Sequence, residues 1–239
     1  MILEVLPTRT GGAAENMAID FLLLQRYPHA AVPRFRHYGW HRPAFTFGYS
    51  QKIAFVRAQL PPGETFDLCR RRTGGGVVDH RDDWTYALVI PRGHPLEELR
   101  ATQSYREVHE ALAAVLRAQG LAAVTKPAPA AAADETGPAG VCFQRAEVFD
   151  VIDETSGGKI AGAAQKRDKH GLLFQGSIWR PAVEAAGAVD WDRFATEFVV
   201  RLAAALGATA EQVPWPEWRE DEASGLTEQY STPEWNEYR

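Results

Sequence analysis

Residues 65–91 read TFDLCRRRTGGGVVDHRDDWTYALVIP, and this stretch decides the class of fold. An alternating segment runs into Gly74, Gly75 and Gly76, and a polar loop then leads into the apolar run TYALVI at 85–90. Alternation and short apolar runs predict strands. Glycines between two strands mark a place where the backbone approaches something closely, because glycine has no Cβ. The stretch therefore predicts two strands connected by a glycine-rich loop that is a candidate ligand contact.

The flanking segments alternate between helical and strand patterns, and no internal repeat is found. Apolar residues at helical spacing, bounded by capping residues and glycines, predict three helices. These helices are expected at 14–27, at 104–120 with Ser104 and Glu107 as a capping box, and at 190–207 with Asp190 as N-cap. Strands are expected at 33–40 and 43–50, and three more at 148–179 with Gly157 and Gly158 in the first turn. The pattern predicts an α/β (α+β) protein, a surface loop at 127–140 and a C-terminal tail with little periodicity.

Composition excludes several functional classes. The 239 residues carry 26 Lys and Arg against 31 Asp and Glu, which gives a net charge of −5, whereas an electrostatic nucleic-acid binder is normally basic. Two cysteines cannot build a disulfide framework, and the N-terminus lacks a cationic start followed by an apolar core. No run of about 18 apolar residues occurs, so no membrane-spanning segment is expected. We expect a reduced, cytoplasmic protein that binds neither nucleic acid nor membrane.

Common site motifs are missing from the sequence. It contains no GxxxxGK[ST] loop, no GxGxxG opening a helix, no HExxH, no paired CxxC and no GxSxG. These absences leave the common ATP, NAD, zinc and serine-hydrolase sites unsupported, and no metal site is predicted.

Three segments remain as carriers of chemistry. Arginines beside the three glycines could donate to phosphate or carboxylate oxygens, although a tight hairpin beside a solvated basic strand end would look the same. Lys159 lies among Gly157, Gly158 and the small residues 161–164, a setting that would partly desolvate its charge, unless it is an ordinary surface lysine. Cys142 follows a Gly-containing loop and could be a nucleophile, or it could be a buried structural cysteine, as Cys69 is expected to be.

Four motifs in one order carry a resemblance to a known family. They are ENMAIDFLLL at 15–24, RRRTGGGVVDH at 70–80, GGKIAGAAQ at 157–165 and QGSI at 175–178. The chain resembles the lipoate-protein ligase A and octanoyltransferase family, which shares its fold with biotin protein ligase and the class II aminoacyl-tRNA synthetase core. The resemblance implies a mixed, largely antiparallel sheet flanked by helices, with a bent slot for an acyl or lipoyl group. It also implies a single catalytic domain over 1–239, without the C-terminal accessory domain that many ligases carry.

The resemblance assigns roles to the residues of these motifs. Lys159 matches the essential lysine of the family, which holds the acyl carbonyl or the adenylate phosphate. The sequence departs from the family where Gly158 replaces the usual Arg and Arg81 replaces the usual Asp. The substrate-binding residues expected from the resemblance and from the small residues of the lysine motif are Arg70, Arg71, Thr73, Gly74, Gly75, Gly76, His80, Ala161 and Gly162.

The activity that the resemblance implies depends on one cysteine. Cys142 stands 17 residues before Lys159, in a Cys-Phe context like that of the internal-cysteine octanoyltransferases. We expect Cys142 and Lys159 to be catalytic, and the octanoyl group to pass from acyl carrier protein, through a cysteine thioester, to a lysine of an acceptor without a cofactor. The acceptors implied are lipoyl domains of 2-oxoacid dehydrogenases or glycine cleavage H protein. Arg70–Arg72 and Lys166–Lys169 are the basic segments expected to dock these acidic partners.

Two alternatives stay open. The chain could be an ATP-dependent lipoate ligase that forms lipoyl-AMP with ATP and Mg²⁺, or a non-catalytic acyl-binding paralogue that keeps the slot without a reactive thiol. A biotin ligase fits less well, because its GRGRxGR loop is absent.

Overall fold

A large mixed sheet forms the centre of the computed structural model, which describes residues 1–26, 32–128, 145–219 and 221–238. Its strands follow the order β12-β1-β3-β7-β11-β10-β9-β8, and β2 pairs with β3. Pairing is antiparallel from β3 to β8 and parallel at the β12 edge. The strands are β1 (Ile2–Val5), β2 (Arg9–Gly11), β3 (Arg34–Trp40), β7 (Asp83–Pro91), β8 (Ala123–Thr125), β9 (Val151–Asp153), β10 (Lys159–Asp168), β11 (Gly171–Trp179) and β12 (Thr209–Gln212).

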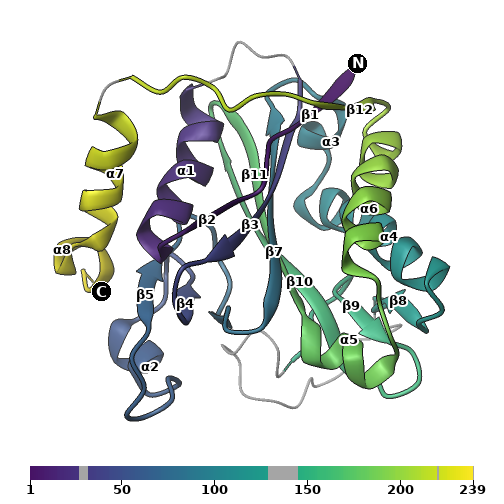
Figure 1. Cartoon of the computed structure of the whole chain (residues 1–239), viewed down its shortest axis with the longest axis horizontal. Helices are drawn as coiled ribbons and strands as arrows, with labels where there is room; N and C mark the ends of the chain where they lie inside the picture. Colours follow the sequence, from purple (N-terminus) through teal and green to yellow (C-terminus); the bar gives the residue numbers. More distant parts are fainter. Residues whose placement is uncertain (27–31, 129–144, 220, 239) are drawn as a thin grey trace.

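Helices cover both faces of this sheet (Figure 1). On one face lie α3 (Pro95–Glu98), α4 (Ala101–Ala118), α5 (Arg180–Ala186) and α6 (Trp191–Ala205), and on the other lie α1 (Ala13–Arg26), α7 (Glu222–Ser231) and α8 (Pro233–Asn236). Strands β7 and β11 are buried on both faces, which explains their nearly continuous apolar sequences. The expected largely antiparallel sheet flanked by helices is confirmed.

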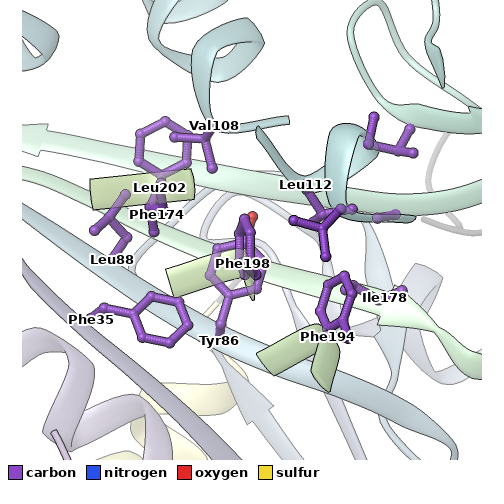
Figure 2. Packing of buried hydrophobic residues seen from close by; sticks show 14 of the residues in the cluster. Phe35, Tyr86, Leu88, Val108, Leu112, Phe174, Ile178, Phe194, Phe198 and Leu202 are labelled. Carbon is purple, nitrogen blue, oxygen red and sulfur yellow. The ribbon is translucent and has the colours of Figure 1, made fainter. Parts of the chain in front are cut away.

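Aromatic rings fill the core beneath α4 and α6, as Figure 2 shows. Phe198 of α6 meets Phe35 and Tyr86 of the sheet edge-on, at ring-centroid distances of 5.8 and 5.3 Å. Such edge-to-face pairs add to the stabilisation from burial. This core gives β7 and β11 a fixed support on the face away from the site described below.

A smaller sheet, in the order β5-β4-β6, lies beside α1 and α8 (Figure 1). It consists of β4 (Ala44–Phe47), β5 (Asp67–Arg70) and β6 (Val77–Asp79), with α2 (Ile53–Arg57) packed through Val56 on its outer side. The glycine-rich loop connects β5 to β6 and faces the large sheet across a pocket. The glycines follow a strand as predicted, but the loop leads into β6, which was predicted as part of a polar loop, before the chain enters β7 in the large sheet.

Two local predictions need correction. Helix α4 begins at Ala101, and Ser104 is buried inside it, so the Ser104–Glu107 capping box is wrong. The N–H of Arg100 instead donates to Oε1 of Gln103 at 3.4 Å. The C-terminal tail contains α7 and α8, which weak periodicity did not predict, whereas Asp190 caps α6 as expected.

Across the described residues, none of the helices combines the length and the apolar character that crossing a membrane requires. The expected loop at 127–140 falls mostly outside those residues.

Candidate functional site

A pocket opens between the two sheets, and it is named the inner pocket here. It encloses about 480 Å³, counting the part open to solvent. The pocket is lined by Met17, Tyr38, Thr46, Arg71, Gly75, Val78, His80, Thr85, Lys159, Gly162, Ala163, Ala164, Gln175, Gly176 and Ser177. Residues of α1, both sheets and the glycine-rich loop thus converge on one small space.

Arg71 shapes the glycine-rich loop at the mouth of the inner pocket. Its guanidinium donates to the carbonyls of Gly74 and Gly76, at 2.8 and 3.1 Å, and to Oγ1 of Thr46 at 2.9 Å. Gly75 has a φ of +88°, a left-handed conformation that favours glycine. The predicted Arg71 and Gly75 therefore line the pocket together, with the arginine holding the loop in its bent form.

Arg70 points away from the pocket. Its buried guanidinium donates to the carbonyls of Tyr49 and Gln51, both at 2.8 Å, and to those of Trp235 and Asn236 at 3.2 and 2.8 Å. The ring of Phe47 stacks against it at 4.7 Å. This arrangement favours an anchoring role for Arg70 over the expected substrate contact.

The exposure of Arg70–Arg72 tests the prediction that this segment docks acidic partner proteins. Arg70 and Arg71 are 0% and 3% exposed, and Arg72 packs over the ring of Trp235 at 4.3 Å. The prediction that Arg70–Arg72 forms an exposed basic docking patch is therefore wrong. Arg70 and Arg71 serve the interior of the protein, and Arg72 is half-buried.

His80 uses both ring nitrogens inside the protein. Nδ1 lies 2.7 Å from Oδ2 of Asp83, and Nε2 lies 2.7 Å from Oγ1 of Thr46. Arg71 also donates to the same Thr46 hydroxyl, so the arginine and the histidine share it. The ring also stacks on Trp40 at 4.1 Å. His80 is therefore held in the pocket wall by contacts on both ring nitrogens and on one ring face.

A buried hydrogen-bond chain continues along the pocket floor. Thr73 donates to Oε1 of Gln175 at 2.7 Å, and Nε2 of Gln175 donates to Oδ2 of Asp20 at 2.6 Å. Asp20 pairs with Arg36 at 2.7 Å, and the two side chains are 0% and 2% exposed. Burial and the charge of Asp20 raise the pKa of Tyr38 well above its usual range, so its hydroxyl stays a donor. The chain fixes α1 against the sheet beside the pocket.

Lys159 stands at the junction with a second space, named the outer pocket. Its Nζ lies 2.6 Å from Oδ2 of Asp150, and the two side chains are 6% and 1% exposed. The hydroxyl of Tyr105 donates to Oδ1 of the same carboxylate and accepts from the N–H of Ala163 at 2.8 Å. The outer pocket encloses about 950 Å³, counting its solvent-exposed part, and Arg145 and Glu147 also line it.

The small residues after Lys159 have different surroundings. A Cβ on Gly162 would lie 2.7 Å from Cε and Nζ of Lys159 and 3.0 Å from Oδ1 of Asp150, so this glycine makes room for the ion pair. Ala161 is fully buried in the core on the other face of the sheet. The expected room for an acyl chain therefore comes from Gly162 and Ala164 rather than from Ala161.

The structure brings most predicted site residues to one place. Arg71, Gly75, His80, Lys159 and Gly162 line the inner pocket, and Gly76 lines the outer one. Thr73 and Gly74 support the loop through their hydrogen bonds with Arg71.

The structure describes Cys69 but not Cys142. Cys69 is buried as predicted, and burial raises the pKa of its thiol far above the usual range. Cys142 lies outside the described residues, and its role stays a prediction.

Sequence reasoning missed the two carboxylates of the site. Asp83, which binds His80, lies two positions after residue 81, where the family usually has its aspartate. Arg81 itself pairs with Asp79 and Glu64 at the surface. Asp150 was missed because its partner, Lys159, is a neighbour only in the folded chain.

Comparison with known proteins agrees with this geometry. The catalytic domain profile of lipoyl protein ligase A/B matches residues 12–180. The chain therefore belongs to the lipoyl protein ligase A/B catalytic domain family. Octanoyltransferase LipM of Halalkalibacterium halodurans is 32% identical over 170 residues, and that of Bacillus cereus is 33% identical over 171 residues. Each alignment covers 69% of this chain and 61% or 60% of the relative, so the chain spans about three fifths of the length of the curated relatives it matches.

Solved structures share the fold at lower identity. A T. acidophilum protein with bound lipoic acid has a TM-score of 0.75 at 20% identity and covers 100% of both chains. A lipoate-protein ligase A bound with ATP has a TM-score of 0.71 at 21% identity and covers 98% of both. At these identities the likeness establishes the shared fold alone.

Proposed function

We propose that this chain is an octanoyltransferase of protein lipoylation, which moves an octanoyl group from acyl carrier protein through a Cys142 thioester to a lysine of a lipoyl domain. The observation that carries the proposal is the position of Lys159, whose ammonium lies where the inner and outer pockets meet. An acyl chain in the inner pocket would bring its carbonyl to this ammonium. The identity to relatives named octanoyltransferase supports the same activity.

The proposed transfer has two balanced steps. The Cys142 thiolate attacks the carbonyl carbon of the carrier thioester, a new C–S bond forms, the old C–S bond breaks, and the carrier sulfur leaves as a thiolate. The neutral acceptor lysine amine then attacks the acyl-enzyme, the C–N bond forms, the C–S bond to Cys142 breaks, and the departing sulfur takes up the proton that nitrogen loses. Lys159 donates to the carbonyl oxygen as negative charge develops, and one such donor is typically worth about 3 kcal/mol. No cofactor takes part.

Chain geometry is compatible with this role for Cys142. The carbonyl of Arg145 lies 3.5 Å from Nζ of Lys159. Arg145 is the third residue after Cys142 in the sequence.

The test compares two octanoyl donors by intact mass spectrometry. With octanoyl acyl carrier protein, we expect an octanoyl adduct that hydroxylamine removes, and Cys142→Ser should abolish it whereas Cys69→Ser should not. A lipoyl domain or glycine cleavage H protein should then accept the group. If the Cys142→Ser variant still modifies the acceptor when given ATP, Mg²⁺ and free octanoate, the chain is a ligase. Binding of octanoate without transfer from either donor would identify a non-catalytic paralogue.

A further inference from the structure

Lys159 places a primary amine at the point where, on the proposed function, a reactive thioester carbonyl would lie. Its side chain lines both pockets and is 6% exposed. An amine at this position is itself a possible acyl acceptor. A neutral amine would attack the carbonyl carbon, a C–N bond would form, the C–S bond would break, and the departing thiolate would take up the proton lost by nitrogen. The resulting amide on the enzyme would end turnover.

The charge state of Lys159 decides whether its nitrogen donates to the carbonyl oxygen or becomes acylated. An ammonium has no lone pair and cannot attack, but it has three N–H groups that can donate to the carbonyl oxygen. A buried ammonium is stable only when its charge is paired. The carboxylate of Asp150 provides that pairing at 2.6 Å.

The groups around Asp150 keep it an acceptor. Besides Lys159, the N–H of Glu147 donates to Oδ2 at 2.7 Å, and the hydroxyl of Tyr105 donates to Oδ1. Burial and the charge of Asp150 raise the pKa of Tyr105 well above its usual range, so the hydroxyl keeps its proton, and its oxygen also accepts from the N–H of Ala163 at 2.8 Å. A protonated carboxyl would need an acceptor, whereas the surrounding groups named here are donors.

The backbone at Asp150 is also held in a defined form. Phe149 has a φ of +67°, a conformation that non-glycine residues adopt only when the surroundings impose it. The carbonyl of Phe149 bonds to Nδ1 of the buried His109 at 2.7 Å, and its N–H donates to the carbonyl of Lys126 at 2.9 Å. Helix α4 and the end of β8 therefore fix the turn that presents the carboxylate to Lys159.

We propose that Asp150 is a positioning residue that holds Lys159 as an ammonium, so that Lys159 donates to the acyl oxygen but does not accept the acyl group. The benefit of this arrangement rests on the proposed function, whereas the acylation of Lys159 can be measured independently of that function.

The test exposes the full chain to the octanoyl thioester of N-acetylcysteamine, which supplies the acyl group without a carrier protein. Peptide mass spectrometry after hydroxylamine then reports amide-linked octanoate on Lys159, because hydroxylamine cleaves thioesters and leaves amides. We expect almost none in the wild type and an increase of about tenfold or more in Asp150→Asn, because the neutral amide leaves the buried Lys159 without the carboxylate that pairs with it at 2.6 Å. The double variant Asp150→Asn, Lys159→Met should lose the adduct.

Gly162→Ala gives a second route that leaves both charged groups in place. Its Cβ would lie 2.7 Å from Cε and Nζ of Lys159 and 3.0 Å from Oδ1 of Asp150, so the flexible end of the lysine must shift and the ion pair is disturbed. We expect the hydroxylamine-resistant adduct to appear here too. Glu154→Gln, which changes an exposed carboxylate just beyond β9, should behave as the wild type.

The outcomes separate the two proposals. If the resistant adduct on Lys159 is no more abundant in Asp150→Asn and Gly162→Ala than in the wild type, the role of Asp150 is refuted. If the wild type takes no octanoyl group from acyl carrier protein, the proposed function fails, whereas the acylation of Lys159 by the small thioester is still measured.

Discussion

Replacing Arg70 with methionine should destabilise the protein without a direct effect on substrate binding. The guanidinium donates to four backbone carbonyls at 2.8 to 3.2 Å, two from the segment after β4 and two from α8. A hydrogen bond to a charged group contributes about 1.5–3 kcal/mol. Part of the loss is recovered, because the buried charge is also removed and some carbonyls regain water. We therefore expect the free energy of unfolding to fall by about 3–5 kcal/mol.

Urea unfolding followed by tryptophan fluorescence measures this change, and thermal melting gives a second value. For a chain of this size, each kcal/mol lowers Tm by about 2–4 °C, which predicts a loss of about 10 °C. The matched control is Arg57→Met. Arg57 pairs with Glu237 at the surface, with 59% and 42% of the two side chains exposed, so its loss should cost under about 1 kcal/mol.

The kinetic readout decides between anchoring and substrate contact. Below the melting temperature, Arg70→Met should keep the KM of the wild type for the octanoyl donor. A variant that melts like the wild type but binds the donor weakly would show that Arg70 contacts substrate, and the reasoning from its hydrogen bonds would be wrong.

Three further predictions concern the core and its titrating groups. Phe198→Ala should lower the free energy of unfolding by about 3–5 kcal/mol in urea titrations, because it empties a buried position. The control Val200→Ala changes an exposed residue of the same helix and should alter this free energy by less than about 0.5 kcal/mol. Equal effects would contradict the packing shown in Figure 2. Because burial raises the pKa of the Cys69 thiol, a Cys142→Ser variant should react with a thiol-specific dye at pH 8 only after unfolding, and rapid labelling of the native variant would refute this. Burial lowers the pKa of His109, so the unfolded state binds more protons than the native state below about pH 6.5, and the free energy of unfolding falls as the pH drops. His109→Gln should reduce the slope of this free energy against pH by up to about 1.4 kcal/mol per pH unit. An unchanged slope would exclude His109 as a source of the pH dependence.

The fold could be predicted where the local pattern and the burial agree. The apolar run of β7 and the capped helix α6 were recognisable, because their burial follows strand or helix periodicity. Helices α7 and α8 were not, because partners distant in sequence stabilise them. Tyr230 and Trp235 stack at 4.6 Å and pack in the core around α1.

The site was predictable to the extent that single residues mark it. Lys159 and the glycine-rich loop stand out in the sequence, whereas Asp150 and Asp83 resemble other acidic residues until the fold brings them to their partners. One signal was overlooked. Successive residues at the end of a strand point in opposite directions, so Arg70 and Arg71 could not both enter the same pocket.

The contact between Arg70 and Asn236 links residues 166 positions apart in the chain. During synthesis at 5–20 residues per second, roughly ten to thirty seconds pass between the two. Until then, Arg70 has two of its four carbonyl partners, those of Tyr49 and Gln51, and lacks the two that α8 supplies. The strand before the glycine-rich loop therefore gains its full set of hydrogen bonds only after α8 has been synthesised.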